Sequence, residues 1–157
     1  MIACENGAEG VKYEDPSLSA VSAPKVNSPL SEILEKAKSG DPDAQFELGA
    51  RYDIGDGVHQ NRSEALRWFR ESAKAGNKYA QLKMGEAFWY GNGVPQDYVQ
   101  AVMWLRKSAT QGNYFARNYM RVAYSNGYGV PVDHEEASRW VDPYDPIYNP
   151  DIVRRKK

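Results

Sequence analysis

The chain has 157 residues and a formal net charge of −1, with 41% apolar residues, which fits one ordinary domain with a continuous core. Without an excess of positive charge to neutralise phosphates, nucleic acid is not expected as a partner. No run approaches the roughly 18 consecutive apolar residues that a membrane helix needs, so the sequence predicts no membrane span.

The first four residues, Met1-Ile2-Ala3-Cys4, have the shape of the end of a bacterial lipobox, in which a cysteine is lipidated. No charged region and no apolar region of an export signal precede them, which leaves two alternatives. Either Cys4 is the lipidation site of a processed protein, or the match is accidental. Cys4 is also the single cysteine, so an intramolecular disulfide is excluded.

The rest of residues 1–28 is rich in Gly, Ser, Ala, Pro and charged residues, without hydrophobic periodicity. This composition predicts a disordered N-terminal tether. Such a tether would hold a lipoprotein off its membrane, which favours a periplasmic, membrane-anchored location. The alternatives are an ordinary ragged terminus and a cytoplasmic protein.

The body of the chain repeats with a period of 36 residues. Glycines recur at Gly40, Gly76 and Gly112, at Gly55, Gly91 and Gly127, and at Gly57, Gly93 and Gly129, and tryptophans recur at Trp68, Trp104 and Trp140. A strict period in this range indicates a stack of identical supersecondary units. Each unit in such a stack buries its apolar face only against its neighbours, and the array presents a long surface to solvent.

Each copy reads as a helical hairpin. In the middle copy, apolar residues at helical spacing predict a first helix from Tyr79 to about Tyr90. The following segment, 91–95, holds two glycines and a proline and predicts a tight turn. Asp97 then supplies the N-cap of a second helix, as Asn61 and Asp133 do in the other copies.

The repeated residues resemble the Sel1-like repeat, a TPR-like family with the pattern Ala-x-x-x-Leu-Gly-x-x-Tyr-x-x-Gly-x-Gly-Val followed by Ala-x-x-Trp. The first copy carries Ala44, Leu48, Gly49, Tyr52, Gly55, Gly57 and Val58, and the second carries Ala80, Met84, Gly85, Phe88, Gly91, Gly93 and Val94. The third copy keeps Ala116, Met120, Tyr124, Gly127, Gly129 and Val130 but has Arg121 in place of the family's glycine. This departure is typical of a terminal cap.

The resemblance implies an all-α, right-handed α-solenoid of about seven helices. We expect a capping helix at 29–40, repeats at 41–76, 77–112 and 113–143, and an irregular basic tail at 144–157 that ends in Arg154-Arg155-Lys156-Lys157. The second helix of the third copy should run from His134 to about Val141, before a proline stops it.

No catalytic, cofactor or metal site emerges from the sequence. The Gly-x-Gly turns lack the third glycine and the preceding strand of a dinucleotide site. The match of Ser22 and Lys25 to a Ser-x-x-Lys motif contains a proline and lies in the tether, where no buried helix can form. His59 and His134 have no partner at metal-ligand spacing. We therefore expect neither an enzyme nor a cofactor.

Residues that differ between copies are the best candidates for function. The recurring tryptophans are expected in the core. A second stripe on each first helix is expected to line the concave side and bind a partner, and Trp89 lies beside it in the position of Asp53. The stripe consists of Asp43 and Glu47, then Tyr79, Lys83, Glu86 and Tyr90, then Phe115, Tyr119, Val122 and Asn126. Exposed aromatics with a charged fringe are typical anchors of a protein interface, although packing within the chain would also explain them.

The sequence thus predicts a monomeric module that binds a protein partner. Short bacterial members of the family with a lipidated start include periplasmic immunity proteins that neutralise antibacterial phospholipase effectors of type VI secretion. The resemblance therefore implies a lipase or other toxin as one possible partner. The alternative is a cytosolic or envelope scaffold that joins other proteins without inhibiting an enzyme.

Overall fold

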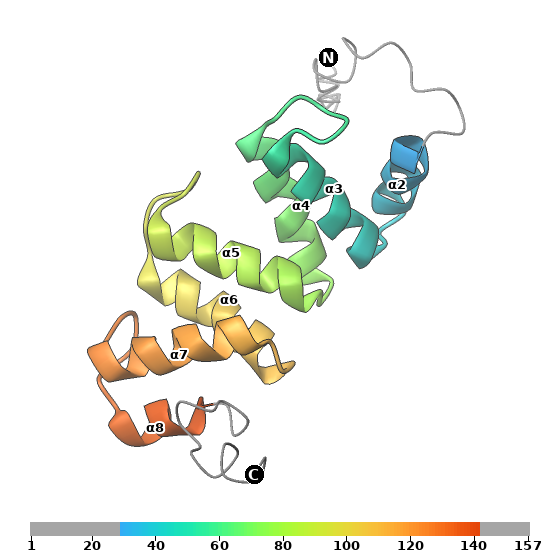
Figure 1. Cartoon of the computed structure of the whole chain (residues 1–157). Coiled ribbons are helices and arrows are strands. Elements are labelled where there is room, and N and C mark those ends of the chain that lie inside the picture. Colours follow the sequence, from blue (N-terminus) through green and yellow to red (C-terminus); the bar gives the residue numbers. More distant parts are fainter. Residues whose placement is uncertain (1–28, 142–157) are drawn as a thin grey trace, which may run out of the picture.

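A computed structural model describes residues 29–141, which form seven α-helices and no strand within that range (Figure 1). The helices are α2 (Pro29–Lys38), α3 (Pro42–Ile54), α4 (Arg62–Lys74), α5 (Lys78–Tyr90), α6 (Tyr98–Thr110), α7 (Tyr114–Asn126) and α8 (His134–Arg139). The prediction of an all-α fold with about seven helices is confirmed. The predicted tether with Cys4 and the predicted basic tail lie outside the described residues.

Polar side chains that accept hydrogen bonds from the backbone mark where the helices begin, and glycines mark where the first helices end. Asp97 accepts hydrogen bonds from the backbone N–H groups of Val99 and Gln100 at the start of α6. The expected N-caps Asn61 and Asp133 accept in the same way at α4 and α8. The first helix of each hairpin ends at a glycine with a positive φ, at Gly55, Gly91 and Gly127. An L-residue with a Cβ pays a steric cost in this conformation, which explains the recurrence of glycine.

The helices stack in chain order, and each packs mainly on the helices before and after it. Three hairpins, α3/α4, α5/α6 and α7/α8, follow one another, with α2 covering the side of α3 at the N-terminal end (Figure 1). This arrangement is an α-solenoid of nearest-neighbour contacts. Within residues 29–141, no helix has both the length and the apolar character that a membrane crossing requires.

The apolar core runs along the array between successive helices. Trp68 and Trp104 are buried in it as expected, whereas Trp140 is only half-buried. The reason is that Trp140 caps the end of the six-residue helix α8, the last described helix of the stack. Buried serines also join the helices: Ser72 Oγ donates to the carbonyl of Pro42 at 2.6 Å, and Ser108 Oγ to that of Lys78 at 2.7 Å.

The glycine that the third copy lacks has a packing explanation. A Cβ at Gly49 would lie 2.8 Å from the ring of Phe69, and one at Gly85 would lie 2.7 Å from Leu105 Cδ2. The residue equivalent to Phe69 and Leu105 in the third copy is Val141, which comes after the end of α8. No helical side chain therefore presses on position 121, and Arg121 is accommodated there.

Gly129 lies against the backbone of the preceding repeat. A Cβ at this position would collide with the carbonyl group of Tyr98 and with Val99 N, and these are backbone atoms that cannot rotate away. Gly112 offers a matched control, because its φ of +80° resembles the +69° of Gly129 but nothing lies within 4 Å of an added Cβ.

We predict that Gly129→Ala lowers the free energy of unfolding by about 1–3 kcal/mol more than Gly112→Ala does, since only the former adds a backbone collision to the cost of a positive φ. Urea denaturation of the full chain, followed by circular dichroism at 222 nm, measures the difference. Equal losses in the two variants would show that the contact between Gly129 and Tyr98 does not hold the second and third repeats together.

Candidate functional site

The predicted partner-binding residues fall on the first helices of the three hairpins, and side-chain contacts connect these helices. We call the surface formed by these residues the α3–α5–α7 face. Between α3 and α5, the rings of Phe46 and Tyr79 lie 5.9 Å apart, and Asn77 Nδ2 donates to Asp43 Oδ1 at 2.7 Å. Between α5 and α7, the hydroxyl groups of Tyr90 and Tyr119 lie 2.9 Å apart. The predicted residues therefore belong to one surface.

Three aromatic side chains of this face are largely exposed. The exposed fraction is 52% for Tyr79 and 64% for both Tyr90 and Phe115. Singly exposed apolar residues are common on proteins, but these rings all come from the first helices of two successive hairpins, α5 and α7. They offer apolar contact area to a partner at little cost in side-chain entropy, because each ring has few rotatable bonds.

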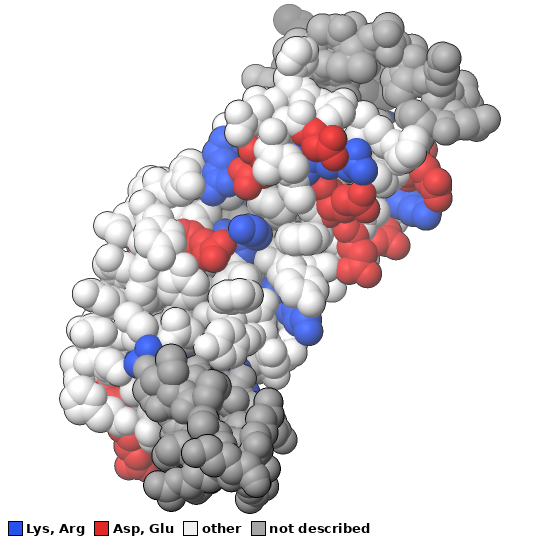
Figure 2. Space-filling view, in the orientation of Figure 1, with Lys and Arg blue, Asp and Glu red and all other residues white. Residues whose placement is uncertain are grey.

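The two ends of the face differ in charge. Residues 41–61 carry five acidic side chains and one basic one, Arg51, a formal charge of −4, whereas residues 113–133 carry +1. Figure 2 shows acidic side chains gathered toward the α2 and α3 end, and few charges over α7. Glu47 is partly neutralised by Arg51 at 3.1 Å, and Asp43 is exposed. The predicted change from acidic to aromatic character along the array is present in the structure.

Tyr119 links α7 to α5 at the aromatic end. It is half-buried, and its hydroxyl group shares a hydrogen bond with that of Tyr90. Burial raises the pKa of Tyr119 well above its ordinary value of 10.0, and the hydrogen bond to Tyr90 and the nearby carboxylate of Glu86 raise it further. Tyr119 is therefore a neutral phenol at physiological pH and keeps the ring of Tyr90 in place.

Trp89, which we expected among the partner-binding residues, is buried, with only 8% of its surface exposed. Three tyrosine rings pack edge-on around it: Tyr98 and Tyr119 at 5.1 Å between centroids, and Tyr128 at 5.6 Å. The expectation of an exposed anchor at this position is corrected, because these rings cover the indole. Trp89 therefore packs beneath the exposed residues of the face, where a partner does not reach it.

The other predicted residues of α7 lie at the far end of the face. Asn126 is exposed and donates from its side chain to the carbonyl of Val122 at 2.9 Å, and Val122 is half-buried. Phe115 packs its ring edge-on against that of Tyr114. These residues extend the aromatic end and add no charge to it.

A hollow of about 290 Å³ opens at the middle of the face, between the first two hairpins. Its lining comes from α3, α4, α5 and the loop after α5: Asp53, Arg62, Phe69, Lys83, Glu86, Tyr90 and Asn92. Lys83, Glu86 and Tyr90 are predicted site residues. The other four were missed: Asp53 occupies the position of Trp89 but is not aromatic, Arg62 and Asn92 lie next to turns, and Phe69 is a core residue.

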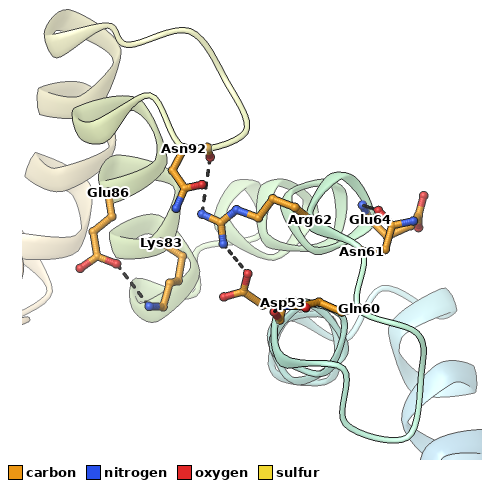
Figure 3. Close-up of polar contacts among 8 residues, drawn as sticks. All are labelled: Asp53, Gln60, Asn61, Arg62, Glu64, Lys83, Glu86 and Asn92. Carbon is orange, nitrogen blue, oxygen red and sulfur yellow. Dashed lines mark hydrogen bonds and ion pairs between the residues drawn. The ribbon is translucent and has the colours of Figure 1, made fainter.

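Two ion pairs face each other across this hollow (Figure 3). On one side, the Arg62 guanidinium group pairs with Asp53 Oδ1 and also donates to the carbonyl of Asn92 at 3.5 Å. On the other side, Lys83 Nζ lies 3.3 Å from Glu86 Oε2. Arg62 thus ties the first hairpin to the loop of the second.

The titratable residues that could serve in catalysis or metal binding do not cluster on this face among the described residues. His59 lies in the turn between α3 and α4, His134 is the first residue of α8, and both are exposed. Within residues 29–141, no three His, Cys, Asp or Glu side chains gather in a way that could hold a metal ion. What the face provides is shape, apolar area and charge, which are the means of recognising another molecule.

Comparison with known proteins agrees with the repeat structure. The Sel1 repeat family matches residues 42–77, 78–113 and 119–141. A Sel1 repeat protein from Oxalobacter formigenes of known crystal structure is 35% identical, with a TM-score of 0.71, and the match covers 80% of this chain and 95% of that one.

A second crystal structure is that of a protective antigen present in uropathogenic Escherichia coli strains, which displays an SLR fold. It is 40% identical with a TM-score of 0.68, and the match covers 73% of this chain but only 24% of that protein. No curated protein matches the chain. Three matched repeats, together with the shared architecture of stacked hairpins, establish that the chain belongs to the Sel1 repeat family.

Proposed function

We propose that this protein is a binding module without catalytic activity, which holds a protein partner against the α3–α5–α7 face. Sel1 repeats generally mediate protein–protein interactions and are typically non-catalytic. The observation that carries the proposal is the row of exposed aromatic rings, Tyr79, Tyr90 and Phe115, beside an acidic end. Large exposed rings of this kind are the residues that contribute most to protein interfaces.

In its sharper form, the partner is a secreted antibacterial phospholipase or another toxin, and this protein is the immunity protein that neutralises it in the periplasm. The lipobox-like residues up to Cys4 and the exposed aromatic rings of the face support this form. Inhibition would require the face to cover the mouth of the toxin's active site, with an interface of roughly 1,600 Å² or more in total. The protein would act as a monomer, one copy to each toxin molecule.

The alternative is a scaffold in the cytosol or the envelope that joins two components without inhibiting either. The charge difference along the face is compatible with this role, since one end suits a basic partner and the other an apolar one. The two forms differ in where the protein is found and in what its partner does when bound.

Affinity purification from the native organism, followed by mass spectrometry, identifies the partner. We predict that Tyr79→Ala and Phe115→Ala each weaken its binding by about 2 kcal/mol, roughly thirtyfold in Kd, because each removes an exposed ring at the interface. Isothermal titration calorimetry with the purified partner measures the loss.

Val99→Ala and Met103→Ala provide the matched controls. Both side chains are exposed and apolar, but they lie on α6, outside the α3–α5–α7 face. They should leave Kd unchanged, and circular dichroism should show that all four variants remain folded. Unchanged binding in the Tyr79 and Phe115 variants, or an equal loss in the α6 variants, would move the binding surface elsewhere.

The location is tested separately. If Cys4 is the lipidation site, metabolic labelling with an alkyne fatty acid marks the wild-type protein in the membrane fraction, and Cys4→Ser abolishes both the label and the sedimentation with membranes. A wild-type protein that remains in the cytosolic fraction with a free thiol would rule out the lipoprotein form and favour the scaffold.

A further inference from the structure

The hollow between the first two hairpins has a filled counterpart one repeat further along. Adding 36 to the number of each residue gives the equivalent position: Asp53, Arg62 and Asn92 correspond to Trp89, Tyr98 and Tyr128. The latter three are all aromatic and pack together, with the rings of Tyr98 and Tyr128 stacked at 4.9 Å. The same junction is therefore built twice, once from polar groups and once from rings.

The opposite wall of the hollow changes in the same way. Lys83 and Glu86 correspond to Tyr119 and Val122 in the next repeat. Tyr119 packs its ring against Trp89 at 5.1 Å, which closes the second junction. At the first junction, the smaller side chain of Asp53 leaves open the space that an indole fills in the second. A space of about 290 Å³ is at the lower limit of ligand pockets and suits one side chain of a partner.

The groups around the hollow favour a cationic guest. Asp53 and Glu86 each pair with a cation through one oxygen atom, and a carboxylate can accept further hydrogen bonds. Tyr90 adds an exposed aromatic ring on which a guanidinium group can stack. Both cations of the lining are paired, Arg62 with Asp53 and Lys83 with Glu86, and the one donor of Arg62 without a partner, Nε, is buried, so the hollow is a poor site for an anion.

The formal charge of the segment around the hollow also favours a cationic guest. Residues 41–61, which include Asp53, carry a formal charge of −4, whereas the equivalent segment 77–97 carries none. This field raises the local concentration of cations at the first junction and not at the second. Among the common side chains, arginine fits best, because its planar group can hydrogen-bond to a carboxylate and stack on a tyrosine at once.

We infer that the hollow lined by Asp53, Glu86 and Tyr90 is a subsite for an arginine side chain of the protein partner. This inference rests on the proposed function and specifies it. A segment bound on the α3–α5–α7 face would place its arginine between the first two hairpins and its apolar side chains over the rings of α5 and α7. The direction in which the partner segment runs along the array is then set by whether its arginine comes before or after its apolar residues.

The subsite can be tested without the partner. The probe is N-acetyl-arginine N-methylamide, titrated into the ¹⁵N-labelled full chain and followed by NMR. We expect saturable shifts of the backbone amides of Asp53, Glu86 and Asn92. The citrulline analogue has the same shape without the charge and should bind at least about fivefold more weakly, since a charge-assisted hydrogen bond is lost.

Two variants locate the effect. Glu86→Gln should weaken arginine binding about tenfold, whereas Glu71→Gln should not. The latter is a matched control, because Glu71 pairs with Lys74 three residues away, as Glu86 does with Lys83, but lies outside the lining of the hollow.

The triple variant Asp53→Trp, Arg62→Tyr, Asn92→Tyr transplants the aromatic junction into the first position. It should stay folded, since the chain already contains that set, and it should show no saturable shifts with the probe. If the triple variant does not fold, Glu86→Gln alone decides the question.

Three results would overturn the inference: no saturable binding of the arginine probe at the hollow, equal binding of the citrulline analogue, or tighter binding of N-acetyl-aspartate N-methylamide. None of these results bears on the proposed function, which is tested by the binding of the purified partner to the Tyr79 and Phe115 variants. Conversely, a chain that binds the arginine probe but retains its partner after loss of both rings would keep the subsite and discard the proposed face.

Discussion

The structure depends on one constraint: a helical hairpin of this size buries its apolar surface only against the hairpins on either side. Every position that contacts a neighbour must therefore suit the same geometry in each copy, and the 36-residue period follows from it. The closest contacts show how strict this is. At Gly49 and Gly85 a methyl group would press into a buried side chain, and at Gly129 it would meet backbone. Small residues recur where helices and turns approach most closely.

Positions that escape this constraint are free to vary, and they are where recognition can develop. The outward residues of α3, α5 and α7 change from acidic to aromatic along the array, while the core residues behind them keep their type. Both junctions between successive hairpins are stabilised, but by different means. An ion pair with a hydrogen bond to the next loop serves at Arg62, and stacked rings serve at Tyr98. The scaffold therefore accepts different chemistry at one position.

The sequence was sufficient to predict the fold because the signals that define it are local and occur three times. Glycines at fixed spacing, helix caps such as Asp97 and the Sel1-like pattern each specify a boundary, and the helices lie where they indicate. The last helix was also predicted to be short, from the proline that follows it. It ends at Arg139, two residues before the predicted end at about Val141, and this shortness accounts for Arg121. The helix boundaries were therefore predictable from interactions between residues that are close in the sequence.

The site was predicted less completely, because it depends on contacts between repeats. Helical spacing placed Tyr79 and Tyr90 on one exposed face, but it placed Trp89 there as well. Only the rings of Tyr98, Tyr119 and Tyr128, which come from three different elements, reveal that the indole is covered. The hollow was missed for the same reason: Asp53 and Arg62 are nine residues apart, and Asn92 is 30 further on. A comparison of equivalent positions in the copies would have identified Asp53, Arg62 and Asn92, because each is replaced by an aromatic residue one repeat later.

The use of two kinds of junction in one array has a mechanical consequence. Ion pairs near the surface are screened by dissolved salt, whereas contacts between stacked rings are not. Increasing ionic strength therefore weakens the polar contact at Arg62 and leaves the ring contacts at Tyr98 unchanged, while the buried core shared by the first and second hairpins, which includes Phe69 and Met84, holds them together at any salt concentration.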